Sequence, residues 1–237
     1  MLESLTPAIN ARLDELVATL EEGCGNNLVA VVVHGSAVRG GWRESTSDVD
    51  LIVVLDDDSE AVLESIGPAL TLARFSGRIE SMILTQAEIA RSADCFPLLY
   101  SDVARTSVTV AGTNPFEGLT ISDEHTRLRI EQELREIRIR MRRVATDMAD
   151  AANFSGAIER KLKQLRGPLW ALLALRKETT EERLDAVLDG VAKAYGIDIT
   201  PLRRVGDEPK VAYATLAKLL DAALDDVDAW IPGKANS

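Results

Sequence analysis

The segment HGSAVRGGWRESTSDVDLIVVL, residues 34–55, carries the pattern on which the fold and the chemistry both depend. Apolar residues 28–33 precede it and predict a strand that ends at a Gly-Ser turn. A loop then leads to Asp48-Val49-Asp50, at the start of a second apolar strand. Because side chains alternate along a strand, we expect Asp48 and Asp50 on one face while Val49 faces the core.

The two carboxylates and the Gly-Ser turn together indicate a site for metal and phosphate. The oxygens of Asp48 and Asp50 are the ligands that a hard divalent cation prefers. Gly35 and Ser36 offer backbone N–H groups and a hydroxyl to a phosphate. This combination at the edge of a sheet predicts phosphoryl or nucleotidyl transfer.

The composition is that of a globular protein with an acidic surface. The chain has 237 residues, 46% of them hydrophobic, which suits one or two domains. No stretch approaches the roughly 20 apolar residues of a membrane span, and residues 1–20 have an acidic amphipathic pattern that is not typical of a signal peptide. Cys24 and Cys95 lack metal-ligand spacing, so we expect buried free thiols and a cytoplasmic protein. The net charge of −11 disfavours nucleic acid as a partner.

Helix and strand patterns predict an α+β chain with two domains, residues 1–118 and 119–237. In the first domain the strand that starts at Asp48 is joined by further strands, and helices are interspersed among them. The expected strands cover 28–33, 78–84 and 107–110, and the expected helices cover 5–22, 59–73 and 85–93, the last opened by a Thr85–Glu88 capping box. The second domain is expected to be an up-and-down bundle of four helices, over 122–152, 157–176, 181–194 and 211–230.

The glycines, the serine and the acids occur in an order that resembles one enzyme superfamily. This is the DNA polymerase beta-like nucleotidyltransferase superfamily, which the chain resembles through GSAVRGG at residues 35–41 and SDVDL at 47–51. The motif is particularly similar to the aminoglycoside adenylyltransferases of the streptomycin and spectinomycin type, and it also resembles uncharacterised bacterial nucleotidyltransferase-like proteins. The resemblance covers residues 28–84 by motif. It implies a mixed nucleotidyltransferase-fold sheet flanked by helices, followed by an all-α helical bundle.

The resemblance also implies a third acid on a neighbouring strand, and Glu80 in the 78–84 segment matches it. Glu80 would then be a catalytic base or a metal ligand, with a solvent-facing strand residue as the plain alternative. The implied reaction uses two Mg²⁺ ions held by Asp48, Asp50 and Glu80. An acceptor hydroxyl would attack the α-phosphate of ATP or another nucleotide, and it needs a proton acceptor within hydrogen-bond reach.

Basic side chains near the motif have two interpretations each. Arg39 and Arg43 would contact the nucleotide phosphates, or they are loop charges in solvent. His34, at the end of the first strand, is more simply a packed histidine than a catalytic one.

The second half carries further basic groups on its first two expected helices. Their i,i+4 spacing from glutamates, as in Glu131–Arg135 and Glu136–Arg140, predicts a solvated, ion-paired helix face. The alternative is a basic wall that meets triphosphate or an acidic substrate, to which Lys161 or Lys163 could contribute. The arginines concerned are Arg127, Arg129, Arg135, Arg138, Arg140, Arg142 and Arg143.

Three functions are compatible with these patterns. The first is an ATP-dependent nucleotidyltransferase acting on a small molecule, with an aminoglycoside as one candidate acceptor. The second is a nucleotidyltransferase that modifies a protein or RNA in a toxin–antitoxin-like system, and the third is a non-catalytic interaction protein on the same fold. The full set of Asp48, Asp50 and Glu80 argues against the third. The acceptor and the nucleotide stay open, as does the choice between a monomer and a homodimer.

Overall fold

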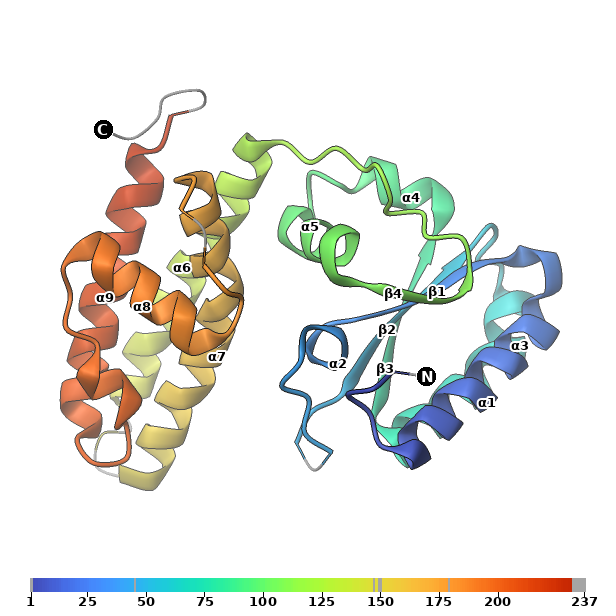
Figure 1. The fold of residues 1–237 in the computed structure, drawn as a ribbon, viewed down its shortest axis with the longest axis horizontal. Coiled ribbons are helices and arrows are strands. Elements are labelled where there is room, and N and C mark those ends of the chain that lie inside the picture. The colour runs from blue at the N-terminus through green and yellow to red at the C-terminus, as the bar shows by residue number, and fades with distance from the viewer. Residues whose placement is uncertain (1, 45, 147, 149–150, 179, 232–237) are drawn as a thin grey trace. The chain divides into compact units, whose positions relative to one another are not determined.

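A computed structural model describes residues 2–44, 46–146, 148, 151–178 and 180–231. The chain divides into two compact units, residues 1–121 and 122–237. The first unit combines a sheet with helices and the second is helical (Figure 1). The α+β class is therefore confirmed, whereas a division into separate domains after residue 118 stays a prediction.

A four-stranded mixed sheet forms the centre of the first unit, in the order β3-β2-β1-β4. The strand β1 (Leu28–His34) runs antiparallel to β2 (Val49–Leu55) and to β4 (Val108–Gly112). The strand β3 (Ile79–Thr85) runs parallel to β2, and α3 (Glu60–Gly77) is the crossover that a parallel pair requires. All four strands lie where the sequence predicts them, to within two residues at the ends.

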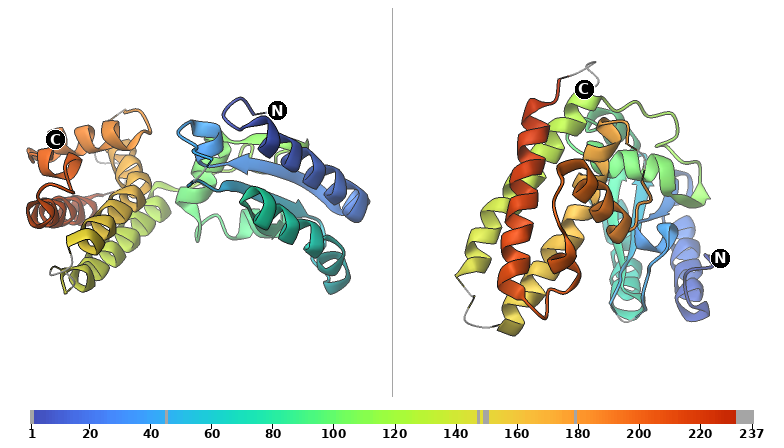
Figure 2. Two further views of the ribbon diagram at one scale, coloured as in Figure 1. Left: turned by 90° about the horizontal axis from the view of Figure 1, so that it is seen from below. Right: turned by 60° about the vertical axis from the view of Figure 1, so that its left-hand side comes forward.

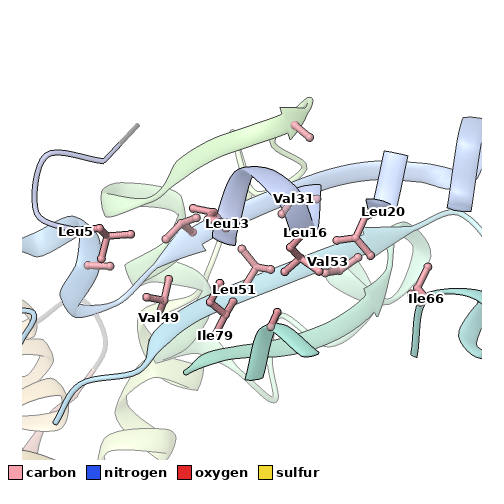
Figure 3. Close-up of a cluster of buried hydrophobic side chains, with 14 of the residues drawn as sticks. Leu5, Leu13, Leu16, Leu20, Val31, Val49, Leu51, Val53, Ile66 and Ile79 are labelled. Carbon is pink, nitrogen blue, oxygen red and sulfur yellow. The ribbon is translucent and has the colours of Figure 1, made fainter. Parts of the chain in front are cut away.

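One face of the sheet is buried under α1 (Pro7–Cys24) and α3, which pack against each other. Figure 3 shows Leu13, Leu16 and Leu20 of α1 together with residues at alternate positions of β2, namely Val49, Leu51 and Val53. Each such buried leucine contributes roughly 1.5–3 kcal/mol to folding. The strand residues of this core include Val31, Leu51, Val53 and Ile79, all at most 1% exposed.

The opposite face carries α4 (Gln86–Arg91) and α5 (Pro97–Thr106) (Figures 1 and 2). The predicted capping box is present, because Glu88 accepts hydrogen bonds from the backbone N–H and the hydroxyl of Thr85 at 2.8 and 3.0 Å. The sequence did not predict α5, which begins with a proline and buries Tyr100 and Val103 completely. Ala30, Val32, Ile52, Val54 and Phe116 complete this second core.

The second unit is built from α6 (Asp123–Ala145), α7 (Ala151–Leu175), α8 (Leu184–Tyr195) and α9 (Pro209–Ala229). The helices α6, α7 and α9 pack on one another, and α8 packs on α7 and α9. The helical bundle is therefore confirmed. A single helix over 122–152 is wrong, because α6 ends at Ala145 and a separate helix begins six residues later; residues 147, 149 and 150 lie outside the described part of the chain.

The expected ion-paired face of α6 is confirmed. Arg135 and Arg140 contact Glu131 and Glu136 as the spacing predicts. Further pairs join α6 to α9 or lie within α6, and they are Arg135–Asp228, Arg138–Asp221, Arg127–Glu131 and Arg129–Glu133.

The two cysteines are less buried than the sequence predicts. Both cysteines are free, but Cys24 is half-buried and Cys95 is exposed, so the expected burial is wrong. Cys95 lies in the turn before α5, where no core covers it.

None of the helices in the described part of the chain combines the length and the apolar content that crossing a membrane requires.

Candidate active site

The turn after β1 brings the backbone against one of the predicted acids. Gly35 has φ 74° and ψ −149°, a conformation that essentially only glycine adopts. A Cβ at this position would lie 2.1 Å from Oδ2 of Asp50. Glycine is therefore needed both for the turn and for the close approach. Gly35 is also the N-cap residue of the short helix α2 (Ser36–Arg39).

The three predicted acids lie at one end of the sheet. Asp50 is the second residue of β2 and pairs in register with Glu80, the second residue of β3. On its other side Asp50 pairs with His34, the last residue of β1. Asp48 directly precedes β2. Because Asp50 and Glu80 alternate with the residues of the α1–α3 core, they face the side of the sheet covered by α4 and α5.

Charge and burial act together on Asp50. Its half-buried position raises the pKa of its carboxyl, and the neighbouring Asp48 carboxylate raises it further. Arg39 lowers this pKa, whereas Asp102 and Glu80 raise it. Asp50 therefore lies in a group of negative charges that a cation would stabilise.

His34 agrees with the simpler of its two interpretations. Burial lowers the pKa of the imidazole; Asp102 raises it and Arg39 lowers it. A half-buried histidine of this kind is mainly neutral near pH 7.

Two arginines contact the outer acids. Arg78 Nη2 and Nε lie 2.8 and 3.0 Å from Oδ1 of Asp48, and Arg74 Nε lies 3.0 Å from Oε1 of Glu80. The Glu80 side chain is 46% exposed, so its position on an apolar strand carries no burial penalty. Exposed ion pairs of this type contribute about 0–1 kcal/mol, so a ligand can displace them easily.

The two predicted phosphate contacts lie in different environments. Arg39 is not a solvated loop charge, because its guanidinium forms a half-buried ion pair with Asp102 of α5. Arg43 is exposed on the loop before β2, where its backbone N–H donates to the hydroxyl of Ser47 at 3.1 Å.

Asp102 is the residue of this cluster that the sequence did not indicate. Its segment was not predicted as a helix, and a lone acid after Phe96-Pro97 has no motif around it. The apolar spacing of Tyr100 and Val103 is the signal that could have placed Asp102 on a helix beside the sheet.

The donor set suits a hard cation in its chemistry. Asp48, Asp50 and Glu80 provide only oxygen donors, and the charges of Asp48 and Glu80 both raise the pKa of Asp50. Within the described residues, no three His, Cys, Asp or Glu side chains are gathered as they are around a metal. Asp48 and Glu80 contact arginines instead, so ion binding requires these two side chains to turn.

A model of the nucleotidyltransferase domain family matches residues 17–144, which is more than half of the chain. The chain belongs to this family. It is therefore an enzyme of the nucleotidyltransferase type, and the predicted superfamily is confirmed. The matched segment contains the whole acid cluster and the Gly35-Ser36 turn.

Comparisons with individual proteins add less. No curated protein matches the chain. Among solved structures, the spectinomycin adenyltransferase AAD(9) from Enterococcus faecialis, crystallised with ATP and spectinomycin, is 16% identical with a TM-score of 0.47; the match covers 90% of this chain and 99% of that chain. A likeness at this level has no bearing on the substrates of the present chain.

Proposed function

We propose that this nucleotidyltransferase transfers AMP from ATP, in the presence of Mg²⁺, to a hydroxyl group of a small-molecule acceptor. The observation that carries the proposal is the pairing of Asp50 with Glu80 at one sheet end, with the Gly35 turn against Asp50 and with Asp48 directly before β2. Family membership supports the reaction class, and the identity of the nucleotide and the acceptor are parts of the proposal.

Each residue has a defined role in this reaction. Asp48 and Asp50 would hold Mg²⁺, which when bound neutralises phosphate charge, and Glu80 acts on the proton of the acceptor; a metal-ligand role is the alternative for Glu80. Gly35 and Ser36 bind the nucleotide phosphates through backbone N–H groups and a hydroxyl. Because the Gly35 backbone lies against Asp50, phosphates bound at this turn would lie close to the Asp50 carboxylate.

The chemical step needs a proton acceptor. The acceptor oxygen forms a bond to the α-phosphorus, the bond between this phosphorus and the bridging oxygen to the β-phosphate breaks, and pyrophosphate leaves. Glu80 takes the proton of the acceptor hydroxyl. Its exposure suits this role, because an acceptor arriving from solvent can reach its carboxylate without a rearrangement of the core.

Calorimetric titration of ATP, with Mg²⁺ and with a chelator, tests the proposal. We expect binding that depends on the metal and that is lost in the Asp48→Asn, Asp50→Asn double variant. This variant should fold normally, because removing like charges relieves repulsion. Glu15→Gln is the matched control, since it neutralises an exposed carboxylate that pairs with Arg12 on α1. Equal ATP affinity under all conditions would refute the metal site.

The acceptor is then found by transfer of labelled AMP over a library. Small hydroxyl compounds, aminoglycosides among them, are compared with proteins and RNA at equal concentration. Label on a macromolecule alone would contradict the small-molecule part of the proposal and leave the reaction class intact.

A further inference from the structure

An ion pair connects the turn region of the candidate site to the helix that covers it. The guanidinium of Arg39, the last residue of α2, contacts the carboxylate of Asp102 on α5. The two side chains are only 17% and 20% exposed. The backbone N–H of Arg39 also donates to the carbonyl oxygen of Gly35 at 3.1 Å. Arg39 is therefore fixed at both ends, its backbone by the turn and its charged group by α5.

Asp102 is itself held rigidly. Tyr100, two positions before it on α5, and Val103, directly after it, are completely buried. The hydroxyl of Tyr100 lies 2.9 Å from that of Ser92, which joins α5 to the end of α4. Arg105 contacts the same carboxylate at 3.2 Å. A group supported in this way can determine where its partner lies.

The pair lies close to the acid cluster. The backbone N–H of Arg39 donates to the carbonyl oxygen of Gly35, and the Gly35 backbone lies against the carboxylate of Asp50, so the pair lies near the end of β1 and the start of β2. In agreement with this position, both charges act on the pKa of Asp50 and of His34. This is the position where the turn meets the proposed phosphates.

We infer that Asp102 is a positioning residue, which holds the guanidinium of Arg39 beside the Gly35 turn so that it can meet the nucleotide phosphates. The inference rests on the proposed function. Asp102 does not touch the nucleotide, and it acts by restricting the rotamers of a flexible arginine before binding.

A competing effect has the opposite sign. The carboxylate of Asp102 carries a negative charge near the phosphates and would repel them, so its removal would strengthen binding. Two features favour positioning. Arg105 shares the charge of Asp102, which reduces the repulsion, and the burial of the pair limits the other positions that Arg39 can adopt. The sign of the change in affinity therefore separates the two effects.

The test measures binding of the α,β-methylene analogue of ATP with Mg²⁺ by calorimetry, since this analogue is not turned over. Asp102→Asn should weaken binding by about tenfold, the lower end of the effect of losing a partner that orients a metal-binding side chain. Adenosine should bind the variant and the wild type equally. Asp102→Glu, which restores the charge, should recover part of the loss. Glu15→Gln should change neither affinity.

A double-variant cycle isolates the coupling. Arg39→Gln alone should weaken binding of the analogue, and adding Asp102→Asn to it should cause no further loss. Arg39→Lys is a second route that leaves α5 unchanged; it keeps the charge but not the planar fork, and it should also weaken binding.

Three results would overturn the inference. The first is unchanged or tighter binding of the analogue by Asp102→Asn, and the second is a loss of affinity in the double variant that equals the product of the two single losses. The third is wild-type affinity in Arg39→Lys. This last result decides the question even if Asp102→Asn does not fold. Each leaves the proposed function standing as long as the wild type binds the analogue. If the wild type binds no nucleotide with Mg²⁺, the proposed function fails and the inference fails with it.

Discussion

Replacing Gly35 by alanine tests the geometry at the centre of the candidate site. The backbone at this position has φ 74° and ψ −149°, and holding alanine in such a conformation costs about 1–3 kcal/mol. The added Cβ would also lie 2.1 Å from Oδ2, 3.1 Å from Cγ and 3.3 Å from Cβ of Asp50. Because three atoms of the same side chain are too close, rotation of the carboxylate alone does not relieve the clash. Gly35→Ala should therefore displace Asp50 and weaken metal-dependent ATP binding.

Gly118→Ala is the control variant, because it should have the backbone strain of a positive φ without a steric clash of the added Cβ. Gly118 has nearly the same φ, 76°, but a Cβ there would meet no atom within 4 Å. Both variants should lose stability in urea unfolding, by about 1–3 kcal/mol for the strain, and Gly35→Ala should lose more. In calorimetry with ATP and Mg²⁺, Gly118→Ala should bind as the wild type does. If the two variants have the same stability and the same affinity, Gly35 and Asp50 are not in the contact described.

Three further predictions concern other parts of the chain. Glu80→Gln should keep ATP binding and lower turnover on the true acceptor by roughly 10²–10⁴-fold; a wild-type rate would exclude Glu80 as the base, and lost binding would make it chiefly a metal ligand. Limited proteolysis should first cut between residues 112 and 124 if this link is exposed, and earlier cleavage elsewhere would contradict two independent domains. Asp226→Asn should lower the free energy of unfolding by about 3 kcal/mol, as measured by circular dichroism in urea, because the 12%-exposed Asp226 contacts Arg176 at 3.0 Å and Tyr195 at 2.8 Å. An unchanged unfolding curve would show that these contacts do not stabilise the second unit.

Local patterns explain most of what the sequence predicts correctly. The strands around the motif are short apolar runs between turn residues, and alternation alone places Asp50 on the face opposite to Val49 and Leu51. The capping box at Thr85 is a contact between residues three apart, so it needs no knowledge of the fold. Local patterns do not predict contacts between segments that are far apart in the sequence.

The residues that the sequence did not indicate depend on such distant contacts. Asp102 is 63 positions from Arg39, and only the packing of α5 on the sheet brings them together. Arg78 contacts Asp48 because β2 and β3 are neighbours in a parallel pair, which the sequence left open. The end of α6 at Ala145 was missed for another reason, because apolar residues at helical spacing continue in the sequence from Met141 and Val144 to Met148.

The antiparallel pairing of His34 with Asp50 has a consequence for engineering. Both ends of the connecting segment 36–47 are anchored by the sheet, so its middle can change in length without a change in strand register. Doubling the length of a flexible loop costs only about 0.6 kcal/mol in closure entropy. Insertions next to the exposed Gly41 would therefore leave the acids where they are. A short reporter peptide inserted there would lie outside the sheet and could report ligand binding at the Gly35 turn.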